Sequence, residues 1–107
     1  MDSNKLLDIL QQFSVDIVDD VNRIEQSLKN GDLNNAREIV HKLKGVAASV
    51  GAVDLHRATE KLNAELKSGE YSIDTLNLLY LVHSQTRTEI ARYVRNLPES
   101  RDPYILL

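Results

Sequence analysis

The sequence predicts an all-α protein, an up-and-down antiparallel four-helix bundle with a short additional helix at the N-terminus. Apolar residues recur at spacings of three and four along nearly the whole chain, whereas the alternation of period two that marks strands is hard to find. The expected connections are only a few residues long, which makes successive helices antiparallel neighbours. The length of 107 residues fits a single domain, with the bundle over about 4–97 and a tail over 98–107.

The N-terminal region is expected to contain two helices that meet at Ser14. The first, short helix covers about 4–13, and Ser14 then serves as the N-cap of the second. The second ends at Gly31, which suits a left-handed C-terminal position, and Asp32 caps the next helix. The two apolar stripes consist of Leu6, Leu7, Ile9, Leu10 and Phe13, and of Ile17, Val21, Ile24 and Leu28.

Three further helices complete the predicted fold. The first of them stops at Gly51, the next stops at the "SGE" segment 68–70, and the last begins near Ser72 or Asp74 and runs to Leu97. The short N-terminal helix is expected to cover one end of the four long ones. The apolar stripes of the first two consist of Ala36, Ile39, Val40, Leu43, Ala47 and Val50, and of Leu55, Ala58, Leu62 and Leu66.

The composition argues against several classes of protein. A net charge of −3 makes nucleic acid an improbable partner, because phosphate binding needs a basic surface. The chain has no cysteine, which excludes disulfides and thiolate metal sites. No apolar run approaches the ~18 residues of a membrane span, so we expect a cytoplasmic location without membrane insertion.

The stretch 40–51, "VHKLKGVAASVG", contains two residues that do not fit an ordinary amphipathic helix. His41 falls roughly 150° from the centre of the apolar stripe and should therefore face water. Gly45 and Ala48 lie on the same outward face, and Gly45 costs about 1 kcal/mol relative to alanine inside a helix. The simplest physical reason for this glycine is the close approach of another protein surface to His41.

An exposed histidine that a partner can approach is suited to phosphoryl transfer. A neutral imidazole has a lone pair on one ring nitrogen, which makes it a nucleophile able to accept a phosphoryl group and release it again. Lys44, one helical turn from His41, can compensate the negative charge that phosphorylation adds. Gly45 and Ala48 form a small-residue track beside His41. Arg37 lies on the same flank of this track as Lys44, and Lys42 lies on the other flank.

These residues resemble the histidine-containing phosphotransfer (HPt) domains of bacterial two-component phosphorelays. The family pattern is His-x-Leu-Lys-Gly followed by small residues and a second glycine, and this chain has "HKLKG" at 41–45 and "VAASVG" at 46–51. Leu55 and Leu62 follow on the partner helix. The motif covers about 36–66, the helical pattern extends the resemblance over nearly the whole chain, and the HPt domains at the C-termini of hybrid sensor kinases are the most similar.

The resemblance implies that His41 is the phosphoacceptor, which receives the group from a receiver-domain aspartate and passes it to another receiver. Lys44 would stabilise the phosphoryl group, and Gly45 would leave room for the active site of the receiver. In this family Mg²⁺ belongs to the receiver, so no metal or other cofactor is expected on this chain. The chain is expected to be monomeric, either free or tethered to a hybrid sensor histidine kinase.

The same resemblance indicates where receiver domains would dock. Gly45, Ala48 and Ala52 would form an exposed surface of small residues beside His41. The basic residues Arg37 and Lys42 would meet the acidic pocket of the receiver.

Asn63 is a departure from the family pattern, since many members have a glutamate directly after the leucine that matches Leu62. In an antiparallel hairpin folded about Gly51, Asn63 lies near the level of His41 and could hydrogen-bond the imidazole.

Two rival functions remain open at this point. A non-phosphorylated helical adaptor would keep the docking face, although it has no need of the imidazole. A histidine-kinase dimerisation bundle also displays a phosphorylated histidine, but it requires a dimerising hairpin and an ATP-binding domain. The chain has no G-x-x-x-x-G-K-[ST] loop and no place for a nucleotide-binding sheet, so we expect no kinase activity of its own.

The remaining histidines and an acidic cluster are assigned structural roles. His83 falls on the apolar stripe of the last helix and should be buried or half-buried, with a neighbour that satisfies it. His56 lies at the edge of its helix and points in a different direction, so the histidines predict no metal site. Asp16, Asp19 and Asp20 are expected to form a solvated face.

Overall fold

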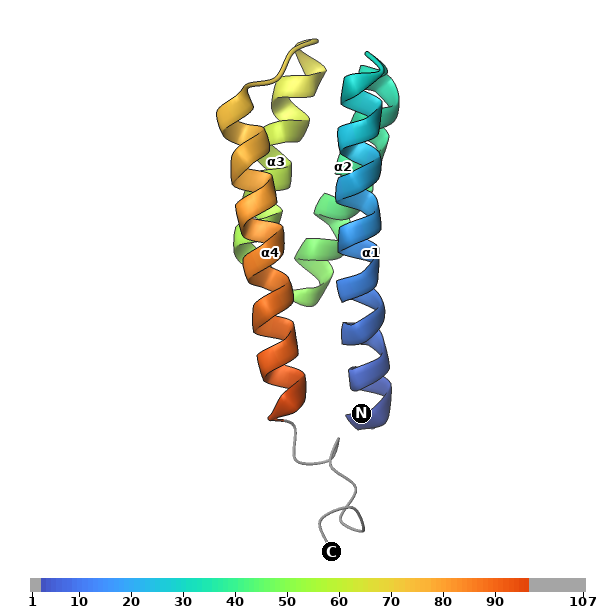
Figure 1. Ribbon diagram of the computed structural model, residues 1–107, viewed down its shortest axis with the longest axis vertical. Helices are drawn as coiled ribbons and strands as arrows, with labels where there is room; N and C mark the ends of the chain where they lie inside the picture. Colours follow the sequence, from blue (N-terminus) through green and yellow to red (C-terminus); the bar gives the residue numbers. More distant parts are fainter. Residues whose placement is uncertain (1–2, 97–107) are drawn as a thin grey trace, which may run out of the picture.

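The computed structural model describes residues 3–96, which form four helices (Figure 1). Helix α1 spans Ser3–Lys29, α2 spans Leu33–Val50, α3 spans Val53–Lys67 and α4 spans Ile73–Arg95. No strand occurs within 3–96, and the predicted all-α up-and-down bundle is confirmed. The predicted tail 98–107 and the predicted helix end at Leu97 lie outside the described residues.

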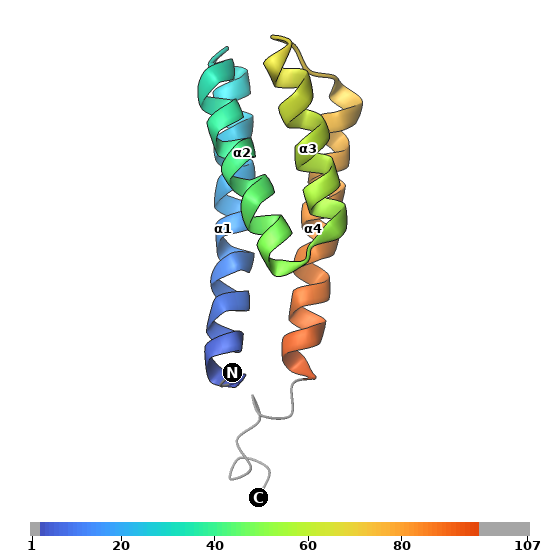
Figure 2. The same ribbon diagram turned by 180° about the vertical axis from the view of Figure 1, so that it is seen from behind.

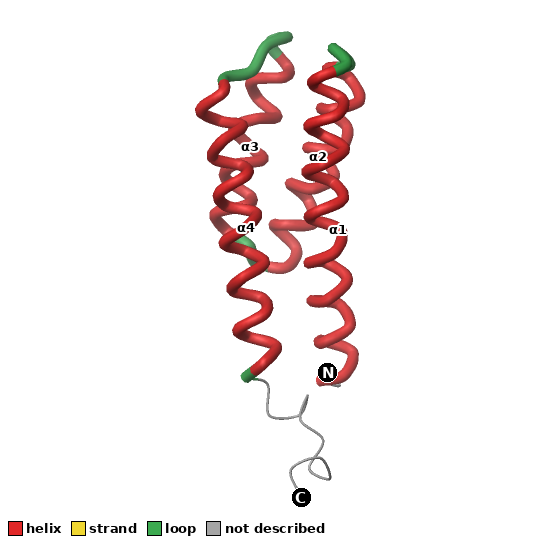
Figure 3. The backbone as a smooth tube through the Cα atoms, in the orientation of Figure 1, coloured by secondary structure: helices red, strands yellow, loops and turns green. Residues whose placement is uncertain are grey.

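The helices pack in a square in which each contacts two neighbours. Helix α1 packs against α2 and α4, and α3 packs against the same two helices. The chain runs up α1, down α2, up α3 and down α4, and Figure 2 shows the α2–α3 hairpin from the opposite side. The connections are short, as the tube drawing in Figure 3 shows.

The expected break at Ser14 is wrong, and the separate N-terminal helix does not exist. Helix α1 continues without interruption for 27 residues, so the expected short helix is its first part. Phe13 and Ile17 are 4% and 0% exposed and stand four residues apart, which keeps the buried stripe continuous across Ser14. A serine inside a helix costs only a few tenths of a kcal/mol, roughly, so it does not end one on its own.

The ends of α2 confirm the predicted cap residues. Asp32 Oδ1 accepts a hydrogen bond from the backbone N–H of Asn35 at 3.1 Å, which satisfies one of the free donors of the first turn. At the other end Gly51 adopts the left-handed conformation with φ 77°, and its N–H donates to the carbonyl of Ala48 at 3.2 Å. This turn makes α2 and α3 an antiparallel hairpin.

Polar contacts fix α4 against α3 and α1. Ser72 is the N-cap of α4, and the Thr75 hydroxyl donates to Glu65 Oε2 of α3 at 2.6 Å, which lowers the pKa of Glu65. The Tyr80 hydroxyl donates to Glu25 Oε2 of α1 at 2.6 Å, and this hydrogen bond is the main cause of a lowered pKa at Glu25. These contacts hold the heights of three helices relative to one another.

From Phe13 onward the core follows the predicted apolar stripes of α1, α2 and α3, whereas Ile9 and Val50 of those stripes are 42% and 36% exposed. Its fully or nearly buried apolar side chains are Phe13, Ile17, Val21, Ile24, Leu28, Ala36, Ile39, Val40, Leu43, Ala47, Leu55, Ala58, Leu62, Leu66, Leu79 and Val82. Helix α4 contributes fewer of them, and two of its inward positions are the threonines Thr75 and Thr86. The Thr86 hydroxyl donates to the Val82 carbonyl at 2.8 Å, so its burial leaves no unmet donor.

Helices α1 and α4 are longer than the hairpin between them. Helix α1 has 27 residues against 18 in α2, and α4 has 23 against 15 in α3. At ~1.5 Å per residue, α1 and α4 therefore project about 12–14 Å beyond the α2–α3 turn. Figure 1 shows this projection at the lower end, where α1 begins and α4 ends.

Candidate functional site around His41

His41 lies on the outward side of α2, as its position in the sequence predicts. Its side chain is exposed, while the adjacent Val40 and the nearby Leu43 are 0% and 1% exposed and anchor the opposite side of the helix in the core. The imidazole therefore stands on a firmly packed helix and remains open to a partner.

A pocket of about 230 Å³ adjoins the imidazole. Five residues line this His41 pocket: Arg37, Glu38 and His41 from α2, and Asn63 and Lys67 from α3. Residues one turn apart on each helix contribute to it, so the antiparallel hairpin builds it directly. The pocket combines two cations, one carboxylate and one amide around a single nucleophile.

Asn63 is the most deeply buried polar residue of the His41 pocket. It is 4% exposed and lies at the level of His41, where the fold of the hairpin about Gly51 places it. Among residues 3–96 the structure gives its amide no side-chain hydrogen bond, to His41 or to any other group. No buried side-chain nitrogen or oxygen among the described residues lacks a partner, so the polar end of this amide reaches the open space of the His41 pocket, where a bound group could meet it.

Lys44 and Gly45 lie one helical turn beyond His41, toward the α2–α3 turn. Lys44 is half-buried and Gly45 is exposed. A Cβ placed on Gly45 would meet no atom within 4 Å, and Gly45 is not among the glycines with positive φ. The fold itself therefore gives no reason for a glycine here, in contrast to the turn at Gly51.

Lys42 is directed toward α1, away from the His41 pocket. Its Nζ lies 3.6 Å from Asp20 Oδ1, and Arg23 Nη1 lies 3.9 Å from the same oxygen. Asp20 is 3% exposed, so the expectation of a solvated face is wrong for this residue, although Asp16 and Asp19 are exposed. Burial raises the pKa of Asp20, and the attraction of Lys42 opposes this shift only in part.

Ala48 and Ala52 lie at the hairpin end of the same face. They line a shallow pocket of about 240 Å³ with His56 and Val53 of α3. Ala48 and Val53 are exposed and Ala52 is half-buried, so small apolar groups reach the surface here. The structure thus extends the small-residue track from Gly45 to the first turn of α3.

The other histidines have structural surroundings. His83 is half-buried, and its Nδ1 lies 2.7 Å from the Tyr80 carbonyl, which confirms the predicted local partner.

Residues 3–96 contain no group of three His, Asp or Glu side chains placed to hold a metal ion. None of the described helices has the length and apolar character needed to cross a membrane.

Lys67 and Glu38 also line the His41 pocket, although the sequence motif does not point to either of them. Lys67 follows Asn63 by four residues, so it shares the same face of α3. Counting outward from the turn at Gly51 places Lys67 and Arg37 at similar heights on the two helices. This register could have identified Lys67 as a neighbour of the His41 region. Glu38 could have been identified as the residue one turn before His41.

Comparison with known proteins identifies the family of this chain. Neither the curated proteins nor the solved structures gave a match to this chain. The family model described as "Hpt domain" matches residues 8–95, which cover most of α1, the whole of α2, α3 and α4, and every residue of the His41 pocket. Domains of this family carry phosphoryl groups on histidine in phosphorelays and interact with receiver domains. By the extent of this match, the chain belongs to the Hpt domain family.

Proposed function

We propose that His41 is the phosphoacceptor of this domain, taking a phosphoryl group from a receiver-domain aspartate and passing it to a second receiver. The observation that supports this most strongly is the His41 pocket, in which an exposed imidazole adjoins two cations and a buried amide. In the transfer, a ring nitrogen of His41 attacks the phosphorus of the aspartyl phosphate. The new N–P bond forms as the P–O bond to aspartate breaks, and the carboxylate of the receiver is released.

The charges around His41 suit a phosphorylated imidazole. A phosphoryl group carries close to two negative charges and oxygens that accept hydrogen bonds from cations. Arg37 and Lys67 border the pocket from α2 and α3, and Lys44 stands on the next turn of α2. Glu38 limits the net positive charge, which keeps the phosphoryl group from being held too tightly to leave again.

The approach of the receiver follows the small-residue track. The surface beside His41 carries only small side chains, those of Gly45, Ala48 and Ala52, so the active site of the receiver reaches the imidazole without obstruction. Mg²⁺ belongs to the acidic pocket of the receiver, and this chain acts as a monomeric carrier without kinase activity. Lys42 takes a smaller part than the sequence indicates, since its ammonium group lies beside Asp20.

The test uses a purified receiver domain that has been labelled on its aspartate with radioactive acetyl phosphate. After mixing, we expect acid-labile label on the wild-type chain and none on His41→Gln. His83→Gln is the control, because His83 lies on α4, away from the proposed receiver surface, and should leave transfer intact. Label on His41→Gln would overturn the assignment. Binding of the receiver without any labelling of the wild type would favour the adaptor function.

A further inference from the structure

The projecting ends of α1 and α4 enclose a second, larger groove, of about 450 Å³, below the α2–α3 turn. We call it the overhang groove. Its apolar walls are Leu6, Leu10 and Phe13 of α1 and Ile90 and Tyr93 of α4, and Val50 lies at its upper edge. Higher in the bundle the hairpin covers the inner faces of α1 and α4, but here the hairpin has already turned back.

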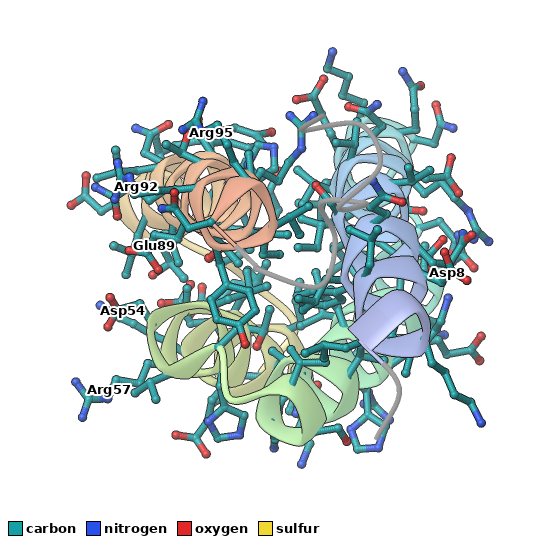
Figure 4. All side chains as sticks on the ribbon, turned by 90° about the horizontal axis from the view of Figure 1, so that it is seen from below. Asp8, Asp54, Arg57, Glu89, Arg92 and Arg95 are labelled. Atoms are coloured by element: carbon teal, nitrogen blue, oxygen red, sulfur yellow. The ribbon has the colours of Figure 1, made fainter. Side chains whose placement is uncertain are left out.

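The overhang groove has mainly apolar walls, with Thr86 and Glu89 as its polar lining residues, and charged side chains stand on its outer sides. Tyr93 is 51% exposed, while Leu6 and Leu10 are half-buried, so large apolar surfaces face the groove without full cover. Figure 4, seen from this end, shows Asp8 extending from the outer side of α1 and Arg92 from the outer side of α4. This division is the pattern of a face that packs against a further segment of protein.

The chain leaves the last helix at the mouth of this groove. Helix α4 ends at Arg95, less than one turn beyond Tyr93. Residues 97–107 follow with the sequence "LPESRDPYILL", which is polar except for Leu97, the prolines and the last four residues. Those four, 104–107, are all large and apolar.

The segment is long enough to turn back into the groove. The groove extends along α4 from Tyr93 to Thr86, about 10 Å at ~1.5 Å per residue. An extended chain covers that distance in about three residues. The seven residues 97–103 therefore leave ample length for a reversal, and Pro98 prevents the helix from simply continuing.

We propose that residues 104–107 of the same chain dock in the overhang groove, where they complete the apolar packing that the short hairpin leaves open. A segment tethered by the seven residues 97–103 has an effective concentration in the millimolar range, which favours it over a second copy of the chain. Glu89 is the charged residue among those that line the groove, and Arg101 in the tether offers an opposite charge. The docked segment borders Gly51 and Ala52, at the edge of the proposed receiver surface.

Disulfide trapping in the full chain tests this proposal, because the natural sequence has no cysteine. The variant Val50→Cys/Leu106→Cys places one thiol at the edge of the groove and one on the docking segment. A disulfide needs Cα atoms about 4.4–6.8 Å apart, so rapid formation reports docking. The control Val15→Cys/Leu106→Cys uses another exposed valine, which lies on the other side of the α1–α4 pair.

We expect an intramolecular disulfide that forms much faster in the Val50 variant than in the Val15 control. Equal rates would show that the segment moves over the surface without docking, and would overturn the proposal. Disulfide-linked dimers of the Val50 variant would assign the groove to a second copy instead.

A second measurement does not depend on new thiols. Ile105→Ser/Leu106→Ser in the otherwise native chain should lower the thermal midpoint and raise the fluorescence of a dye that binds exposed apolar surface. The control Glu99→Ser changes the tether alone and should leave both unchanged. If the double variant matches wild type in both readings, the segment does not occupy the groove.

Discussion

Asn63 of α3 lies in the wall of the same pocket as His41 of α2, with 4% of its surface exposed and with no side-chain hydrogen bond to any of residues 3–96. Since no buried side-chain nitrogen or oxygen in these residues lacks a partner, the polar end of the amide is open to the water of the pocket. A phosphoryl oxygen on His41, or the imidazole itself, is a partner that would become available during transfer. Changing this residue should therefore affect phosphoryl transfer more than the stability of the free domain.

Asn63→Leu should keep or raise the stability of the domain while it slows phosphoryl transfer. Leucine has nearly the same shape and packs well at this largely buried position, while it removes the amide that faces the pocket. Urea unfolding measures the first effect, and the rate of label transfer from a phosphorylated receiver measures the second. A variant that is destabilised yet transfers at the normal rate would show that Asn63 serves the fold and not the chemistry.

Lys67→Met should shorten the lifetime of the phosphorylated state or weaken its formation. The change keeps most of the aliphatic stem but removes the cation that borders the His41 pocket. A charge-assisted hydrogen bond of about 1.5–3 kcal/mol corresponds to a loss of roughly 10- to 100-fold in the phosphorylation equilibrium.

Lys61→Met is the control for this prediction, since Lys61 is exposed on the same helix but does not line the pocket. Lys67→Arg should retain most of the wild-type phosphorylation, because arginine keeps the positive charge at this position. Equal behaviour of the Lys61 and Lys67 variants would exclude a specific role for Lys67.

Gly45→Ala should stabilise the free domain. No atom lies within 4 Å of the added Cβ, and Gly45 has no positive φ that alanine would find strained. The gain in helix propensity is about 1 kcal/mol, which for a domain of this size raises the thermal midpoint by about 4–8 °C. Gly45→Gln should fold as well but slow transfer sharply, because its side chain blocks the approach to His41. Normal transfer by Gly45→Gln would contradict the close-approach explanation of this glycine.

The sequence determined most of the fold because its helix ends coincide with strong local signals. Asp32 and Ser72 accept hydrogen bonds at helix starts, and Gly51 takes the left-handed conformation at a helix end. The prediction failed at Ser14 because serine occurs both at N-caps and inside helices. Only the packing of Phe13 and Ile17 shows that Ser14 lies inside a continuous helix.

The site was predictable where it depends on one helix and less so where it depends on two. The exposure of His41 and Gly45 follows from the helical period alone. Lys67 enters the pocket through the relative height of α2 and α3, which helical periodicity does not specify. Asp20 is buried for a similar reason, since the position of α2 against α1 decides which residues beside the apolar stripe are covered.

Asp20→Asn should make the domain at least as stable as wild type at neutral pH. Burial raises the pKa of Asp20 above its ordinary 3.8, so the folded state binds a proton more readily than the unfolded state. The contribution of this residue to stability therefore falls as pH rises through the folded pKa, and is most favourable below 3.8. The nearby cations do not offset this cost, and Lys42 remains 61% exposed, so it can return to water.

Urea unfolding of wild type and Asp20→Asn between about pH 4 and pH 7 measures this difference. The advantage of the variant should shrink as pH falls, since both side chains are then neutral. Asp19→Asn, on the exposed face next to Asp20, should show no such trend. A variant that is less stable at neutral pH would mean that the ion pairs outweigh the burial of the carboxylate.

Ser14→Ala separates a continuous α1 from two helices that meet at this residue. In the interior of a helix the change replaces serine by the best helix former, so stability should rise by up to about 0.5 kcal/mol. At an N-cap the same change would remove a side-chain acceptor and cost about 1 kcal/mol. Ser72→Ala provides the matched comparison, because Ser72 Oγ accepts the Thr75 N–H at 3.1 Å as the N-cap of α4. Thermal unfolding followed by circular dichroism should therefore move in opposite directions for the two variants. A loss of stability in Ser14→Ala that equals the loss in Ser72→Ala would restore the break in α1.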